Sequence, residues 1–222
     1  MKVRLLIFCS FFISLLSFSQ DTIDLKASFD IANNQIYVNQ TIQYKNTSNQ
    51  VLHTIYLTDW SNSYSKKNTP LGKRFAEEYK NDFHFAKETD RGATTIQFIK
   101  QNQTNLHYNR LPKQADIIKV KLDKPLQENQ SYTLNLEYVI KLPNNKFTRY
   151  GITSLKNINL RYWYITPAVF NGKWHLYSNK DLNDAFVPKA NLNFEISFPE
   201  NYILTTELDE VNKITKDSIT TV

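Results

Sequence analysis

The amino-acid sequence predicts an all-β fold, an antiparallel sheet or sandwich into which one helix is inserted. The main evidence is strict alternation of apolar and polar residues, because successive side chains of a strand point to opposite faces. Residues 22–31 and 35–45 alternate in this way on either side of Asn33 and Asn34, and residues 131–140 repeat the pattern. Since Asn tolerates positive φ, the first two segments are predicted to form a hairpin.

Further short segments are rich in β-branched and aromatic residues, and turn residues separate them. Asn171 and Gly172 predict a tight turn, which leads into Trp174 and the residues after it. The other predicted strands cover residues 51–57, 94–99, 106–110, 116–122, 157–165, 202–206 and 218–222.

One segment has the period of a helix instead. Thr69 is a typical N-cap, and Pro70 suits the first helical position. The apolar residues that follow recur every four positions, at Leu71, Phe75, Tyr79 and Phe83. The sequence therefore predicts a helix over residues 70–85.

The first 19 residues have the composition of a signal peptide. Lys2 and Arg4 precede the apolar stretch 5–16, and the small residues Ser17 and Ser19 come before an expected cleavage site ahead of Gln20. The stretch is too short to span a bilayer comfortably. We therefore expect an exported protein, periplasmic or secreted, with no membrane association after the signal is removed.

Composition limits the function of the mature chain. The only cysteine, Cys9, lies in the signal, so no disulfide or thiolate ligand is expected after cleavage. The chain has 27 basic and 21 acidic residues, and loss of Lys2 and Arg4 leaves 25 against 21, scattered along the sequence. Nucleic acid is therefore not an expected partner, because no basic stripe could neutralise a row of phosphates.

Catalytic motifs are not found in the sequence. None of the four histidines belongs to an H-E-x-x-H pair, and there is no G-x-S-x-G elbow. We therefore predict no catalytic residue, no metal ligand and no cofactor in this chain. Convergence of Asp59, Asp184 and Glu195 into a paired-carboxylate hydrolase stays open as a weaker alternative.

Aromatic residues gather in the second half of the chain. Trp163, Trp174, His175 and Tyr177 are candidates for a ligand-binding surface, because exposed aromatic rings stack on sugars and peptides. The competing interpretation is a core or interface layer, since Trp and Tyr bury large areas while keeping a polar tip hydrated.

The segment D-A-F-V-P-K-A-N-L-N-F-E-I-S-F-P carries a family resemblance. It resembles a strand in the amino-terminal β-domain of the aminopeptidase N family of zinc metallopeptidases. The residues that match the family pattern are Asp184, Lys189, Ala190, Leu192, Phe194, Ile196 and Pro199.

The resemblance implies a saddle-like β-domain over residues 20–222, with the zinc and the peptide substrate belonging to the full-length parent. Such a domain would pack on a zinc domain and wall its substrate cavity. Because residues 218–222 look like a strand, we expect the chain to be the front portion of a longer protein, with the zinc domain C-terminal to it. Phe186 replaces a family proline, and the family's Gln-x-Glu and G-x-M-E-N motifs are missing, which indicates a divergent bacterial branch. The alternative is a free-standing secreted β-sandwich that binds a glycan or peptide through its aromatic surface.

Overall fold

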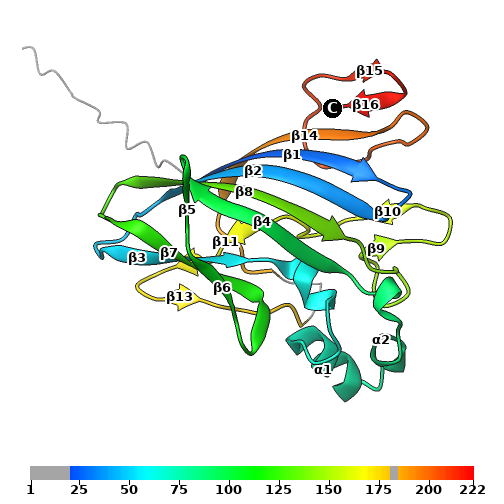
Figure 1. Cartoon of the computed structure of the whole chain (residues 1–222), viewed down its shortest axis with the longest axis horizontal. Helices are drawn as coiled ribbons and strands as arrows, with labels where there is room; N and C mark the ends of the chain where they lie inside the picture. The colour runs from blue at the N-terminus through cyan, green and yellow to red at the C-terminus, as the bar shows by residue number, and fades with distance from the viewer. Residues whose placement is uncertain (1–20, 181–184) are drawn as a thin grey trace, which may run out of the picture.

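The computed structural model describes residues 21–180 and 185–222. An eight-stranded sheet forms one layer, in the order β15-β16-β14-β1-β2-β8-β4-β5, and a four-stranded sheet forms the second, in the order β11-β3-β7-β6 (Figure 1). The strands of the large sheet are β1 (Asp21–Asp30), β2 (Gln35–Lys45), β4 (Ala93–Gln101), β5 (Thr104–Asn105), β8 (Ser131–Lys141), β14 (Ala190–Pro199), β15 (Ile214–Lys216) and β16 (Ile219–Thr221). The small sheet contains β3 (Leu52–Thr58), β6 (Tyr108–Leu111), β7 (Gln114–Leu126) and β11 (Thr166–Pro167). Two short ladders complete the strands, β9 (Gly151–Ile152) with β10 (Ile158–Asn159) and β12 (Val169–Phe170) with β13 (Trp174–His175).

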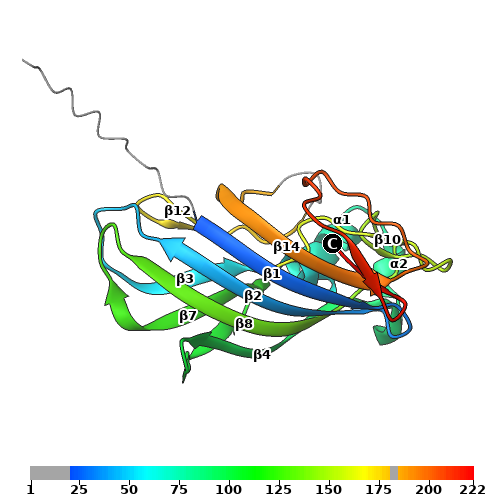
Figure 2. The same ribbon diagram turned by 90° about the horizontal axis from the view of Figure 1, so that it is seen from above.

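The all-β prediction is confirmed, with one difference in strand direction. β1 and β14 are parallel, with Ile23 opposite Leu192 and Ala27 opposite Ile196. Antiparallel neighbours can be joined by a tight hairpin, whereas parallel neighbours require a long connection. The chain from β8 to β14 supplies that connection, so β14 can enter the sheet beside β1 in the same direction (Figure 2).

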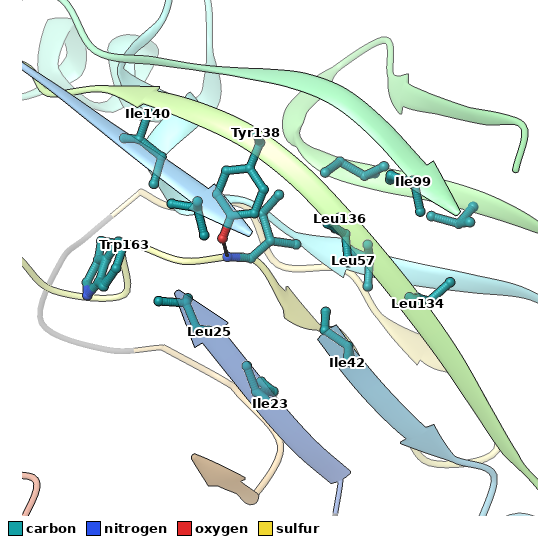
Figure 3. Close-up of a cluster of buried hydrophobic side chains, with 14 of the residues drawn as sticks. Ile23, Leu25, Ile42, Leu57, Ile99, Leu134, Leu136, Tyr138, Ile140 and Trp163 are labelled. Carbon is teal, nitrogen blue, oxygen red and sulfur yellow. Dashed lines mark hydrogen bonds between the residues drawn. The ribbon is translucent and has the colours of Figure 1, made fainter. Parts of the chain in front are cut away.

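The core lies between the two sheets and is built from the inward faces of the alternating strands. In β2 and β8 every second residue is buried, as predicted from the sequence. Figure 3 shows these side chains converging with those of β1, β3 and β4; the labelled residues are Ile23, Leu25, Ile42, Leu57, Ile99, Leu134, Leu136, Tyr138, Ile140 and Trp163. Burial of this continuous apolar layer contributes most of the stability of the fold, since residues 21–180 and 185–222 contain no cysteine that could form a disulfide.

The predicted hairpin between β1 and β2 is confirmed. Thr22 lies opposite Gln43 and Asp30 opposite Gln35, and Asn34 has a φ of 57° in the turn. Asp30 fixes the turn further, because its carboxylate accepts a hydrogen bond from the backbone N–H of Asn33 at 3.1 Å.

The predicted helix is present but divided in two. α1 (Pro70–Glu77) begins at the Thr69 N-cap, whose hydroxyl oxygen accepts from the Gly72 N–H, and α2 (Asn81–His84) follows. Between them Tyr79 has a φ of 58°, which an α-helix cannot continue through. Two 3₁₀ segments, η1 (Trp60–Tyr64) and η2 (Glu88–Asp90), flank the helices.

Two predicted strands are wrong. In residues 157–165 only Ile158 and Asn159 pair with another strand, and Tyr162 has a φ of 49°, which interrupts an extended run. Residues 202–206 form no strand. The last prediction, residues 218–222, is confirmed: β16 pairs with β14, and Val222 exchanges both backbone hydrogen bonds with Ile196. The predicted signal peptide lies outside the described residues.

Candidate functional site

A large apolar trough is the main surface feature of the described structure. Its volume is about 1360 Å³, and its lining includes apolar side chains of β1 and β14 in the large sheet. β14 forms the floor with its inward side chains, Leu192, Phe194, Ile196 and Phe198. Residues 157–164 form one wall and residues 201–208 the other.

Several apolar side chains at the rim of the trough are exposed. Ile203 is 92% exposed and Leu155 83% exposed, and Val187 and Leu208 are also accessible to solvent. Single exposed apolar residues are ordinary, but several that line the same concavity are typical of an interaction surface. The trough is therefore the strongest candidate site on the chain.

The family-pattern residues are distributed along this same strand. Ala190 begins β14, the three apolar residues after it belong to the trough floor, and Pro199 ends the strand. Lys189 is exposed just before the strand, and Asp184 lies outside the described residues. The pattern therefore contributes a strand with one apolar face turned toward the trough.

Trp163, one of the aromatic candidates, lies in the trough wall and is almost completely buried. Its ring contacts those of Phe29, Tyr164 and Phe194 at centroid distances of 6.3, 5.7 and 6.2 Å. These rings connect the wall to β1 and β14, so that the wall is held against the sheet.

Trp174 lies elsewhere, on β13. It packs against Tyr44, Tyr56 and Phe170, with centroids 5.9, 5.5 and 5.0 Å apart. The turn at Asn171 and Gly172, where Gly172 has a φ of 67°, places this ring over both sheets. Trp174 therefore anchors the β12–β13 hairpin.

His175 and Tyr177 form a separate surface cluster with Phe186. The His175 ring lies 5.9 Å from Tyr177 and 5.4 Å from Phe186, and the latter two rings are 5.9 Å apart. Tyr177 and Phe186 are both more than half exposed. The structure thus brings two of the four aromatic candidates together and adds Phe186, which the sequence had marked only as a departure from the family.

A buried polar cluster supports the structure around η1. The carboxylate of Asp59 accepts from Arg110 Nη2 at 2.7 Å and from Thr94 Oγ1 at 2.8 Å, and it is 1% exposed. Asn62 adds a bond from its amide nitrogen to the Ala115 carbonyl at 2.7 Å. A buried carboxylate needs such partners, because desolvation of an unpaired charge is costly.

Asp116 is a second buried carboxylate in this region. It accepts from Ser178 Oγ at 2.8 Å and from the Asn179 N–H at 2.6 Å. Burial raises the pKa of Asp116 above its ordinary value, and the nearby Asp59 charge adds a smaller increase. These bonds fasten residues 178–179 to β7.

The structure separates two of the three carboxylates that the paired-carboxylate alternative would bring together. Asp59 is inside the protein, whereas Glu195 is on the outer face of the large sheet, in an ion pair with Lys26 at 2.7 Å. The third member, Asp184, is outside the described residues. Arg110 and Asp116 were not selected from the sequence, because no local spacing connects them with Asp59.

Among residues 21–180 and 185–222, no group of three His, Cys, Asp or Glu side chains is arranged to hold a metal ion. The helices in the same part of the chain are too short and too polar to cross a membrane.

Comparisons with known proteins show similarity in structure. No protein-family model and no curated protein matches the chain. A solved structure of an M1 zinc metallopeptidase variant from Deinococcus radiodurans, bound to a Tyr-Ser-Ala substrate, is similar over 91% of this chain at a TM-score of 0.51 and 12% identity. A further structure of an M1 zinc metallopeptidase from Deinococcus radiodurans has a TM-score of 0.48, 11% identity and the same 91% coverage.

The matched region is 38% of each metallopeptidase chain. The chain thus spans well under half the length of these enzymes. Its fold resembles part of an M1 zinc metallopeptidase, and at 12% identity the likeness concerns the fold alone.

Proposed function

We propose that this chain is the non-catalytic N-terminal β-domain of an exported zinc metallopeptidase of the aminopeptidase type. In this proposal the apolar trough packs on a zinc domain in the same protein and walls that domain's peptide-binding cavity. The observation that carries the proposal is the fold similarity to the M1 enzyme, which covers 91% of this chain and 38% of that one.

The trough supports the proposal. Exposed Ile203 and Leu155 would leave water on contact with a partner, and each buried large aliphatic side chain contributes about 1.5–3 kcal/mol. The ring contacts of Trp163 and the hydrogen bond that Ser61 Oγ donates to the Trp163 carbonyl at 2.8 Å hold this part of the trough wall in place, so that little ordering cost remains there at association. Zinc would belong to the partner domain, since the described residues provide no ligand set for it.

Peptidase assays with aminoacyl chromogenic substrates test the proposal. The purified 222-residue chain should release no amino acid, and the zinc-peptidase portion of the same protein should be more active with this chain than without it. Release by the 222-residue chain alone would refute the non-catalytic role. If the activity of the peptidase portion is the same with and without this chain, the chain does not form a wall of the substrate cavity.

Export is the second part of the proposal. N-terminal sequencing of the protein recovered from the periplasm or medium should begin at Gln20. Retention of Met1 in cells would argue against a cleaved signal.

The surface cluster of His175, Tyr177 and Phe186 favours a second candidate, a free-standing module that binds a glycan or peptide. Calorimetric titration with oligosaccharides and short peptides tests it. Binding that is lost in Tyr177→Ala but kept in Tyr37→Ala, an exposed tyrosine on β2, would favour the module over the peptidase domain.

A further inference from the structure

The outer edge of β14 is paired along only part of its length. β16 lies beside the second half of the strand, with Ser197 opposite Thr221 and Pro199 opposite Ile219. Within the described residues, no strand pairs with the outer edge from Ala190 to Glu195 (Figures 1 and 2). The first half of β14 is therefore a free edge of the large sheet.

The existing bonds identify which backbone groups point out of this edge. The N–H of Ile196 donates to the Val222 carbonyl at 2.8 Å, the N–H of Val222 donates back at 3.0 Å, and the Glu200 N–H donates to Ser218 at 2.9 Å. Backbone direction in a strand alternates with a period of two. The N–H and C=O groups of Leu192 and Phe194 therefore point outward in line with the β16 ladder.

This edge lacks the protection that most sheet edges carry. Natural edges are guarded by proline, by charged residues or by bulges, because unpaired backbone groups invite another strand. Residues 190–195 contain one charged side chain, Glu195, and Lys26 on β1 neutralises it at 2.7 Å. Two donors and two acceptors are thus available to an incoming chain.

We propose that Leu192 and Phe194 form an acceptor edge for an extended strand, which runs antiparallel to β14 and in line with β16. The strand is contributed by the zinc-peptidase portion, and to that extent the inference rests on the function proposed above. Strand addition of this kind gives affinity through main-chain bonds and specificity through alternate side chains.

The two faces of the edge define the chemistry of the strand. On the trough side the incoming side chains would meet Leu192 and Phe194, over which Tyr164 lies with its ring 5.0 Å from that of Phe194. On the outer face they would meet polar pairs, Asn193 with Asp24 at 2.7 Å and Glu195 with Lys26. The strand is therefore apolar at alternate positions and polar between them.

Amide hydrogen exchange by NMR tests the edge directly. In the dilute 222-residue chain, the N–H groups of Leu192 and Phe194 should exchange fast, while those of Asn193 and Glu195, which face β1, should be protected. The peptide acetyl-Lys-Val-Thr-Val-Thr-Val-Lys-amide should slow exchange at both edge positions by about tenfold or more, the effect of new backbone hydrogen bonds.

Two variants separate the backbone from the side chain. Leu192→Pro removes an outward N–H that no strand of the described chain uses, and because it also fixes φ and replaces the leucine side chain, it should weaken peptide binding by about tenfold or more. Leu192→Ala shortens the side chain but keeps the N–H, so its affinity for the peptide should be much closer to that of the wild type. Equal binding by both variants would overturn the acceptor edge, as would edge amides that are already protected in the dilute chain.

The source of the strand is tested with the zinc-peptidase portion of the same protein. Its addition should protect the same two amides, and Leu192→Pro should reduce that protection. Association that does not protect these two amides would show that the zinc-peptidase portion does not contribute the strand, while leaving the proposed function intact. Protection that rises with chain concentration alone would assign the edge to a second copy instead, and no association at all would refute the proposed function, with the peptide experiment still deciding the edge.

Discussion

The phenol of Tyr138 on β8 donates a hydrogen bond to Oε1 of Gln40 on β2 at 2.5 Å, and the two side chains together bind both backbone polar groups of Ile165, the residue that follows the trough wall. Gln40 Nε2 donates to the Ile165 carbonyl at 2.6 Å, and the Ile165 N–H donates to the Tyr138 oxygen at 3.2 Å. All three residues are buried. This closed set of bonds fixes the aromatic segment against the large sheet without any strand pairing.

Tyr138→Phe should destabilise the protein by about 1–3 kcal/mol, because it leaves Gln40 Oε1 and the Ile165 N–H buried without the Tyr138 hydroxyl as their partner. Urea denaturation measures the change. Tyr37→Phe is the matched control on the exposed face of β2 and should cost little; equal effects of the two would show that the buried bonds contribute nothing particular.

Arg110→Met should destabilise by about 3 kcal/mol, since it leaves the Asp59 carboxylate buried without its cation. Asp59→Asn combined with Arg110→Met should be less harmful than Arg110→Met alone. Thermal denaturation of the two variants provides the comparison. If the double variant were the less stable, the uncompensated charge would not be the cause.

Stability should also depend on pH through Asp21. Burial raises the pKa of Asp21 to about 6, and a backbone bond from Lys45 opposes the increase. The folded state therefore holds this proton more tightly than the unfolded chain, whose Asp pKa is about 3.9. The resulting stability is complete below pH 4 and is lost as the pH rises to about 6.

Asp21→Asn stays neutral and can still accept the Lys45 N–H. Its stability relative to wild type should therefore increase by up to about 3 kcal/mol between pH 4 and pH 7 in urea titrations. A difference that is constant across this range would contradict the raised pKa.

Gly151→Ala should be strongly destabilising. Gly151 has a φ of 123°, and an added Cβ would lie 2.1 Å from the Pro143 carbonyl oxygen. Gly172→Ala is the matched control, also at positive φ, but its Cβ would meet no atom within 4 Å, so it should cost about 1 kcal/mol. Melting temperatures of the two variants that coincide would rule out the close approach as the cause.

The sequence predicts the parts of the fold that depend on local period. β1, β2 and β8 follow from alternation, because a two-residue repeat of burial is encoded within each strand. The strand predicted over residues 157–165 is wrong because the aromatic side chains that suggested it, Trp163 and Tyr164, pack against other rings in the trough wall and do not belong to a paired strand. The split of the helix depends on positive φ at Tyr79, a residue type that gives no sequence signal for it.

The candidate site was only partly predictable. The pattern of residues 184–199 located the floor strand of the trough, since alternation and family resemblance coincide there. The supporting polar cluster could not be predicted, because Asp59 and Arg110 are 51 positions apart and meet only through the packing of η1 beside β7, the strand with which β6 pairs. Likewise residues 202–206, within the segment 201–208 that lines the trough, were expected to form a strand, which would have placed Ile203 in a sheet rather than at the rim.

The proposed contact between the trough and a zinc domain is tested most directly by association of this chain with the zinc-peptidase portion of the same protein, measured by analytical ultracentrifugation. Ile203→Asp places a charge at the rim, and Tyr37→Asp places the same charge on the outer face of the large sheet; both positions are exposed, so both variants should fold. Ile203→Asp should weaken association by about tenfold or more, while Tyr37→Asp should bind as the wild type does. Equal binding by the two variants would show that the trough is not the contact surface.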